Sequence, residues 1–430
     1  MDNKFRMTPP PSGDIKMPVV PTFETEVLPN GAMLHVMPGG NQSIVKIEIN
    51  VAAGSLRTSR ALIASSTAEL LSEGTEFHTA QEMAEALDFY GAYTWPKSSI
   101  TRASVSSLCV ERDLKHIVEL VNEIIRHPAF PDEEVELYKA QEIQNFDMKM
   151  LKTPYLASRA MLHALYAPGC RYGRVARHED YDNLTPQALR DFHAEAYRPN
   201  GAHIFVSGRP SDDDIRFIAE TFGTTDWQPG PTWEIPGPEY NKTSSRTMIE
   251  FDGEQTSVRV FRPIFNRSHP DMLPFGMANA ALGGYFGARI SQNLRERLGL
   301  TYGAYSTLNV NKFRGVHSIS TEVKTGSHEQ VVREIFNDME RLASECITDR
   351  EMETLRGFMK GEMLHYFDSV LTSADTVAAF MLEDVNMDYV NDYYRIASDI
   401  SKEEIRQMAA KWLVAGEYSV VCVGKGVGGE

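Results

Sequence analysis

Apolar and polar residues follow two different periods along this chain. Residues 26–37 and 44–53 alternate apolar and polar positions, and the first segment contains Asn30-Gly31, a dipeptide typical of a tight β-hairpin. Residues 114–125 instead repeat apolar positions at helical spacing. Strands that are adjacent in sequence and are followed by helices predict an α+β fold, in which a mostly antiparallel sheet has helices packed on one face.

The same pattern occurs twice. Residues 183–208 align without a gap with residues 399–424, which lie 216 positions later. Each copy begins with a helix N-cap signal, Thr185 before a proline in the first and Ser401 with Glu404 in the second. Each copy then predicts one amphipathic helix and a β-rich stretch that ends in glycine.

Three further landmarks recur in the same order, at offsets between 212 and 217 residues. They are Gly91-Ala92-Tyr93 with Gly303-Ala304-Tyr305, the helix 114–125 with 328–342, and the helix start at Phe130 with that at Ile347. We therefore interpret the chain as two copies of one domain.

Composition places the boundaries between these copies. We predict a first domain over residues 23–222 and a second over 245–430. The segment 223–244 between them holds four prolines, a composition that cannot sustain a helix and that predicts an exposed, semi-rigid linker. A proline-rich arm precedes the first domain over residues 1–22.

Charge and composition exclude several classes of protein. The net charge of −16 argues against nucleic acid or an anionic membrane as a partner. The chain has no apolar run of about 18 residues, and Pro9 to Pro11 stand where a secretory signal would place its apolar stretch. The four cysteines are scattered and form no CxxC pair, which is typical of buried thiols in a reducing compartment. We expect a cytoplasmic protein that does not enter a membrane.

Four sequence landmarks together point to a known family. They are LPNGAMLHVMP near the start, ELLSEGT at residues 69–75, YRPNGAHIFVSG at the end of the first domain, and LRERLGLTYGAYS in the second. With them the chain resembles the pitrilysin/insulinase (M16) peptidases of the short, two-domain type. The resemblance covers nearly the whole chain and implies the LuxS/M16 metallopeptidase-like fold in both domains.

The zinc motif of that family is lost from this sequence. Active members carry HxxEH on the helix just before a Gly-Thr pair, where two histidines bind zinc and the glutamate activates the metal-bound water. Counted back from Gly74-Thr75, Ser65 and Glu69 occupy the histidine positions, and Ala68 occupies that of the general base. The resemblance therefore implies no metal and no other cofactor in this chain.

The third zinc ligand of the family is a glutamate on a later helix. Counting back from Pro154 places that position at Phe146, which cannot bind a metal, but Glu142 lies one helical turn earlier. The sequence leaves open which of the two residues occupies the position. With either one, no imidazole is present to hold zinc.

The family's active domain also pairs substrate with an exposed edge strand, which corresponds here to residues 91–97. Pro96 in this segment has no N–H group to donate. Two interpretations remain open: Pro96 blunts the edge against peptide pairing, or it ends the strand before a turn.

The second domain keeps a different family feature. Active assemblies use an arginine and a tyrosine, seven residues apart, to hold and polarise the substrate carbonyl, and Arg295 and Tyr302 keep this spacing. A cation and a phenol beside a developing oxyanion stabilise the transition state. The structural alternative is that Arg295 pairs with an acidic neighbour on its helix while Tyr302 packs in the core.

These features predict an inactive subunit that completes a partner's active site. The expected partner is a homologous M16 chain with HxxEH and zinc, and the pair would enclose unfolded peptides in a closed chamber. Alone, the chain is expected to cleave nothing. Two alternatives remain: a peptide-binding or scaffold protein without a catalytic partner, and a homodimer with another activity.

Overall fold

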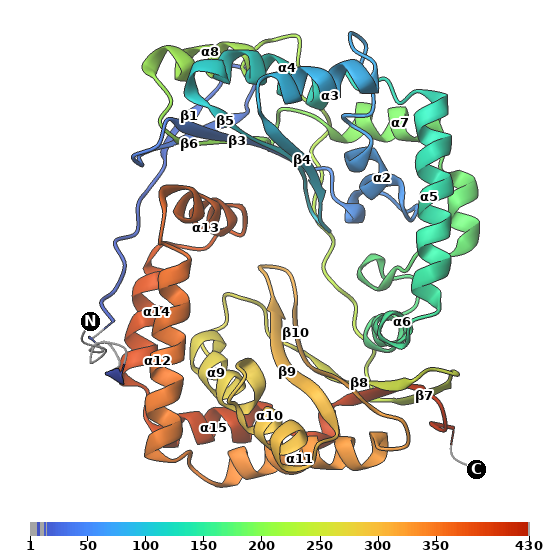
Figure 1. Cartoon of the computed structure of the whole chain (residues 1–430), viewed down its shortest axis with the longest axis vertical. Helices are drawn as coiled ribbons and strands as arrows, with labels where there is room; N and C mark the ends of the chain where they lie inside the picture. The colour runs from blue at the N-terminus through green and yellow to red at the C-terminus, as the bar shows by residue number, and fades with distance from the viewer. Residues whose placement is uncertain (1–6, 9–12, 14, 429–430) are drawn as a thin grey trace.

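Two β-sheets, each with its own layer of helices, make up the molecule (Figure 1). The computed structural model describes residues 7–8, 13 and 15–428. Pro9 to Pro11, which are atypical of a secretory signal, lie outside the described residues. The two sheets share no strand, because the first uses residues 24–208 and the second residues 246–424. The predicted α+β class is confirmed, while the domain bounds at 222 and 245 stay predictions.

The first sheet has six strands in the order β1-β2-β6-β3-β5-β4. Its strands are β1 (Glu24–Val27), β2 (Met33–Pro38), β3 (Ile44–Val51), β4 (Tyr93–Ser98), β5 (Ala103–Val110) and β6 (His203–Gly208). All neighbours pair antiparallel except β2 and β6, which are parallel. The hairpin expected at Asn30-Gly31 joins β1 to β2, and Gly31 takes the positive φ that this turn requires.

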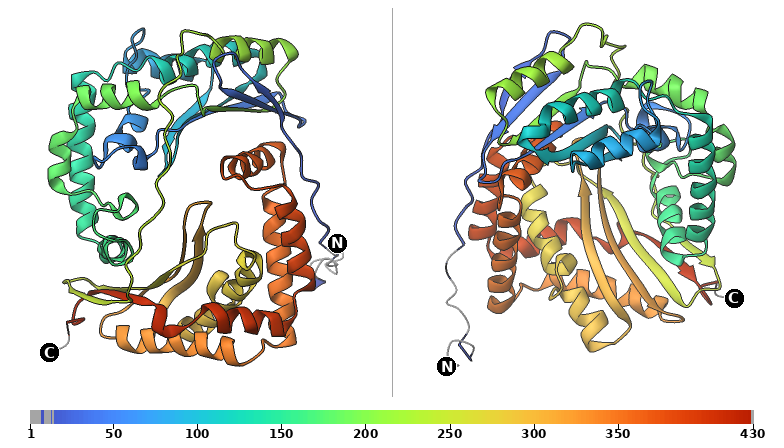
Figure 2. Two further views of the ribbon diagram at one scale, coloured as in Figure 1. Left: turned by 180° about the vertical axis from the view of Figure 1, so that it is seen from behind. Right: turned by 45° about the horizontal axis from the view of Figure 1, so that its top comes forward.

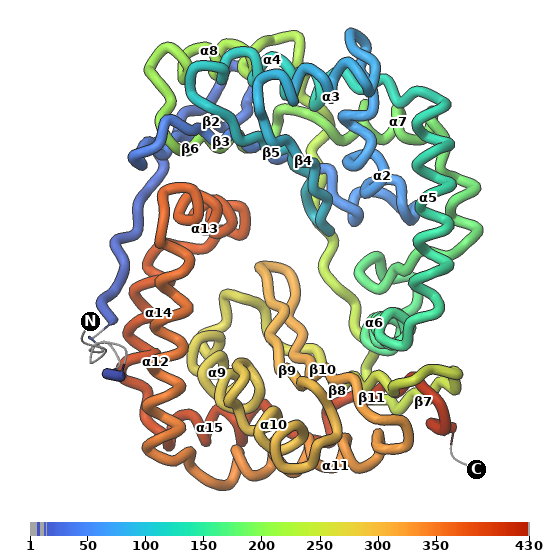
Figure 3. Tube along the Cα trace, in the orientation of Figure 1, coloured from blue at the N-terminus to red at the C-terminus, as the bar shows by residue number. Residues whose placement is uncertain are grey.

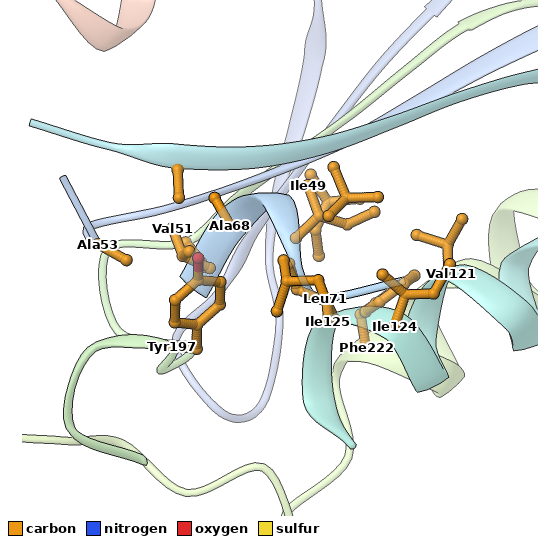
Figure 4. Close-up of a cluster of buried hydrophobic side chains, with 14 of the residues drawn as sticks. Ile49, Val51, Ala53, Ala68, Leu71, Val121, Ile124, Ile125, Tyr197 and Phe222 are labelled. Carbon is orange, nitrogen blue, oxygen red and sulfur yellow. The ribbon is translucent and has the colours of Figure 1, made fainter. Parts of the chain in front are cut away.

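The helices of the first half lie mainly on the outer face of this sheet. They are α2 (Ile63–Glu69), α3 (Ala80–Phe89), α4 (Leu114–Arg126), α5 (Asp132–Met150), α6 (Thr153–Leu165), α7 (Pro186–Ala196) and α8 (Asp212–Phe222). Side chains of β3, α2, α4 and α8 fill the space between the helices and the sheet (Figure 4). This packing makes the first half a hydrophobic unit of its own.

The second sheet repeats the plan with five strands in the order β7-β11-β8-β10-β9. The strands are β7 (Arg246–Glu250), β8 (Gln255–Ile264), β9 (Thr301–Val310), β10 (Gly315–Lys324) and β11 (Ser419–Gly424). Its helices are α9 (Met272–Asn279), α10 (Arg289–Ser291), α11 (His328–Ser344), α12 (Asp349–His365), α13 (Val370–Leu382), α14 (Asp388–Asp399) and α15 (Lys402–Trp412). β6 and β11 occupy corresponding places, as the sequence repeat predicts.

Local capping signals explain where the repeated helices begin. The Thr185 side chain accepts a hydrogen bond at the start of α7, and Ser401 and Glu404 form the predicted capping box at the start of α15. A second capping box, from Thr348 and Glu351, starts α12. Each satisfies backbone N–H groups that would otherwise lack partners.

The two halves exchange helices. α6 of the first half packs on β8 and β11 of the second sheet, where Ala157 and Leu165 meet Phe261 and Val421. In return α13 of the second half packs under β2 and β6 of the first sheet, as both views of Figure 2 show. We call this arrangement the helix exchange. It joins the two sheets through apolar contacts, to which Val20 and Phe23 near the N-terminus also contribute at α13.

The connection between the halves is mostly exposed, but several of its aromatic residues are anchored. Residues 223–245 form no helix, as predicted, and run from one half to the other (Figure 3). However, Trp227 is buried and its indole N–H donates to the carbonyl of Tyr197. Further along, the Tyr172 hydroxyl donates to the carbonyl of Pro236. Most residues of the segment are exposed, as expected, while Trp227 joins the first core and Trp233 and Tyr240 pack partly buried against the α6 cluster.

Within the described residues, no helix is long and apolar enough to cross a membrane. The cytoplasmic location stays a prediction.

Candidate functional site

Residues 65–69, where the resemblance places the family's zinc motif, lie in α2. Ser65, Ala68 and Glu69 lie on one face of it because residues three and four apart meet on a helix surface. The Ser65 hydroxyl donates back to the carbonyl of Leu62, 2.9 Å away. Ala68 is 0% exposed and belongs to the hydrophobic core near Val51 (Figure 4). The general-base position is thus a methyl group in apolar surroundings.

Two carboxylates approach each other beside this helix face. Burial raises the pKa of Glu69, and the neighbouring charge of Glu142 on α5 raises it further. Tyr138, one turn before Glu142, hydrogen-bonds the Ser66 side chain, and burial raises the Tyr138 pKa to about 12. The Glu142 carboxylate therefore lies opposite the position that the second zinc-binding histidine occupies in active relatives.

Phe146 belongs to a separate aromatic cluster. It is buried, and its ring meets those of Tyr155 and Tyr181, while the Arg159 guanidinium lies over it. Of the two residues that the sequence left open for the third ligand, Glu142 is therefore the one that faces α2.

These residues do not fit a catalytic zinc ion. They offer one hydroxyl and two carboxylates, without imidazole and without a base in the place of Ala68. Across the described part of the chain, no group of three or more His, Cys, Asp or Glu side chains is arranged to hold a metal ion.

The edge strand next to this face carries a proline. β4 pairs only with β5 and so forms one edge of the first sheet. Pro96 lies inside β4, which continues to Ser98, so the interpretation that Pro96 ends the strand was wrong. Pro96 and the neighbouring exposed Lys97 are both typical of edges that resist pairing with another chain.

Arg295 lies in the second half on a π-helical segment, Gln292–Arg297. Its Nε donates to Glu296 Oε1 at 2.8 Å, so the predicted pairing with an acidic neighbour is present. Its guanidinium carbon also lies 3.3 Å from the centre of the Phe286 ring. The Arg295 side chain is consequently only 15% exposed, whereas Phe286 is 69% exposed.

Tyr302 is the second residue of β9 and is 94% exposed. The alternative that placed Tyr302 in the core was therefore wrong. The backbone N–H of Gly299 donates to the carbonyl of Arg295, so one turn positions the arginine helix and the tyrosine strand together. Arg295 is held in place by its neighbours, while the phenol of Tyr302 is open to solvent.

Sequence reasoning missed Phe286 as a neighbour of Arg295. The signal that was present is an aromatic pair between glycines, Gly283-Gly284-Tyr285-Phe286-Gly287. Tyr285 stacks on Phe358 with ring centres 5.0 Å apart, which fixes one side of the loop and leaves Phe286 to cover Arg295.

Comparison with known proteins supports the same family. A family model described as the peptidase M16 inactive domain matches residues 183–357. An uncharacterized zinc protease of Mycobacterium leprae is 25% identical over 305 residues, which cover 69% of this chain and 67% of that protein. A protein of Helicobacter pylori named a non-peptidase homolog is 21% identical over 349 residues, covering 80% of this chain and 77% of that protein.

The fold agrees with solved structures. The crystal structure of a peptidase M16 inactive domain from Pseudomonas fluorescens superimposes with a TM-score of 0.85 at 22% identity, covering 95% of this chain and 99% of that chain. The repeated α+β domains and the comparisons lead to one conclusion: residues 183–357 match the peptidase M16 inactive domain, and the chain is similar to M16 proteins over most of its length.

Proposed function

We propose that this chain is the non-catalytic subunit of a two-chain M16 zinc peptidase. In this proposal a homologous partner with HxxEH supplies the zinc, and the two chains enclose an unfolded peptide between them. Arg295 and Tyr302 reach the partner's active site and hold the substrate carbonyl. This chain by itself is inactive.

The exposure of Tyr302 is the observation that carries the proposal. The phenol of Tyr302 is 94% exposed at the start of a strand, so the described residues cover almost none of its ring. Its hydroxyl is free to donate to an oxyanion in a second molecule, where such a donor stabilises the transition state.

Arg295 requires a local change before it can act in the same way. Its ion pair with Glu296 is partly exposed, and such pairs contribute about 0–1 kcal/mol. The stack on Phe286 adds about 0.5–2 kcal/mol. Both are small enough for a substrate oxyanion and partner contacts to offset, so Arg295 can turn towards a substrate when the chamber closes.

The test is reconstitution with an M16 chain that has an intact HxxEH motif. We expect peptide hydrolysis only when the two chains are mixed. In that mixture Arg295→Gln and Tyr302→Phe should each lower kcat 100-fold or more. Mass measurement should show that the complex of each variant is intact. Arg297→Gln and Tyr305→Phe are matched controls on the same helix and strand, and they should retain activity. Tight zinc in the isolated chain, with peptidase activity that a chelator abolishes, would refute the proposal.

The alternative is a peptide-binding or scaffold protein with no catalytic partner. The contacts of Arg295 favour it, because Glu296 and Phe286 already occupy the guanidinium. This alternative predicts that substitution of Arg295 and Tyr302 has no effect on any turnover in a mixture. A stable homodimer of this chain, found by mass measurement, would instead support the third possibility of an unrelated activity.

A further inference from the structure

A polar cavity of about 490 Å³ lies between the first sheet and α13. Its floor is formed by β3, β4, β5 and the loop between β4 and β5, and its other wall is formed by α13, the helix contributed by the second half. Six of the residues that line it are charged. They are Lys46, Glu48, Lys97, Arg102, Asp375 and Glu383. We call this space the Arg102 cavity.

Every carboxylate in the Arg102 cavity already has a partner. Lys46 pairs with Glu48 at 3.3 Å and with Asp375 at 2.5 Å. Glu48 also accepts a hydrogen bond from Ser106. Glu383 accepts one from the backbone N–H of Lys312 at 2.9 Å. The acidic groups of the cavity are therefore satisfied inside the protein.

Two cations of the cavity are left without an anion. Among the residues that the structure describes, neither Lys97 nor Arg102 forms an ion pair. Arg102 donates from Nη2 to the carbonyl of Gly201 at 2.8 Å, but its Nε is buried without an acceptor. Burial lowers the Arg102 pKa to about 10. The charge of Asp384 raises this pKa, but Asp384 is itself paired with Lys312 at 2.7 Å.

Within the described residues the half-buried Arg102 guanidinium has no carboxylate partner, whereas buried charges are normally paired. Arginine is also the side chain best suited to hold a carboxylate through two parallel hydrogen bonds. His203, the nearest imidazole, does not compete for an anion, since burial and Arg102 lower its pKa to about 3 and keep it neutral. An external anion would complete the site.

The other lining groups indicate which anion fits. Glu48, Asp375 and Glu383 surround the cations, so a polyanion such as a nucleotide would be repelled. The Trp95 ring offers an apolar surface, and Asn50, Ser99 and Thr101 offer hydrogen-bonding groups for a peptide backbone. The lining therefore favours a single carboxylate on a peptide.

We propose that the Arg102 cavity binds a carboxylate of an extended peptide, with Arg102 as the principal contact, Lys97 as the second cation and Trp95 against the neighbouring apolar residue. This carboxylate site rests on the peptide-binding part of the proposed function but requires neither zinc nor a partner chain. The carboxylate can come from a C-terminus or from an acidic side chain.

Three five-residue peptides, each with a blocked N-terminus, test the site by calorimetry with the full chain. Each contains alanines and one phenylalanine; the first has a free C-terminus, the second a C-terminal amide, and the third an amide with one glutamate. We expect the first or third peptide, or both, to bind at least 10-fold more tightly than the second. Whichever of them binds identifies the source of the carboxylate.

Variants then assign the contact. Arg102→Gln should weaken carboxylate binding at least 10-fold, while Arg102→Lys keeps the charge and the fold and should give an intermediate affinity. Lys97→Gln, at an exposed position, should weaken binding several-fold. Arg209→Gln, an exposed arginine outside the cavity, is the control.

Equal affinities for all three peptides, no binding of any of them, or unchanged affinity in Arg102→Gln would each overturn the carboxylate site. The result is separate from the proposed catalytic role. If carboxylate peptides bind through Arg102 while Arg295→Gln leaves turnover unchanged in a reconstituted pair, only the role as a catalytic subunit fails.

Discussion

Ala68, at the position where the resemblance places the family's general base, is part of the hydrophobic core. In an active relative its position faces the metal-bound water, whereas here its methyl group is 0% exposed and packs with Val51 and Leu71. A glutamate restored at this place would enter apolar surroundings. The altered motif is therefore tied to stability as well as to activity.

We predict that Ala68→Glu destabilises the chain by at least about 2 kcal/mol, since it buries a charge without a partner. Urea unfolding followed by circular dichroism measures the effect. Glu353→Gln, at an exposed position of α12, is the control and should change the free energy of unfolding by less than about 0.5 kcal/mol. Equal stability of Ala68→Glu and the wild type would show that the side chain turns away from the core.

The surroundings of Arg295 could not be deduced from residue spacing. Arg295 and Tyr302 were identified by their place in a family motif, but the stack on Phe286 depends on how the loop at Gly283 folds. A Cβ atom at Gly283 would lie 3.0 Å from the backbone nitrogen of Ser306, so glycine permits the close approach of this loop to β9. Such contacts are set by tertiary packing and leave little trace in local sequence.

At the scale of elements, the sequence predicted what local signals determine. Capping residues, alternation and the Asn30-Gly31 turn located β1, β2, α7 and α15 correctly because each signal acts within a few residues. The helix exchange was not predicted. Both α6 and α13 present similar small and apolar residues. Their periodicity therefore does not predict which of the two similar sheets each helix covers.

The helix exchange can be tested at Val377, which is 2% exposed where α13 meets Met37 of the first sheet. We predict that Val377→Asp detaches α13 and raises hydrogen exchange of residues 370–382 at least 10-fold, with α11 unchanged. Mass spectrometry of exchanged peptides measures this. Ala379→Asp places the same charge on an exposed position of the same helix and should leave exchange close to that of the wild type.

At the scale of the whole molecule, buried histidines couple stability to pH. His317 is enclosed by Ser306, Asn279 and Tyr418, with hydrogen bonds of 2.5 to 3.0 Å, and burial lowers its pKa to about 3. Burial also lowers the pKa of His193 to about 4. Both side chains are neutral in the folded chain, while in the unfolded chain they take up protons near pH 6.5.

Below pH 6.5 the unfolded chain thus binds more protons than the folded chain, and protonation favours unfolding. We predict that the free energy of unfolding is nearly constant above pH 7 and falls between pH 6.5 and 4, by about 1.4 kcal/mol per pH unit for each such histidine. Urea unfolding at several pH values measures the slope. His317→Gln should reduce the slope, whereas His116→Gln, at a half-exposed position, should not. An unchanged slope in His317→Gln would assign the acid sensitivity to other groups.

The helix exchange has a consequence for how such a molecule can arise. Each half lends one helix and receives one, so neither half covers both faces of its own sheet. A single ancestral domain built on this plan would have had to pair with an identical copy around a twofold axis. The present chain has the form of that symmetric dimer with its two subunits fused end to end. Fusion allows the two copies to diverge in sequence. One half can then acquire residues such as Pro96 and Ala68 while the other half keeps Arg295 and Tyr302.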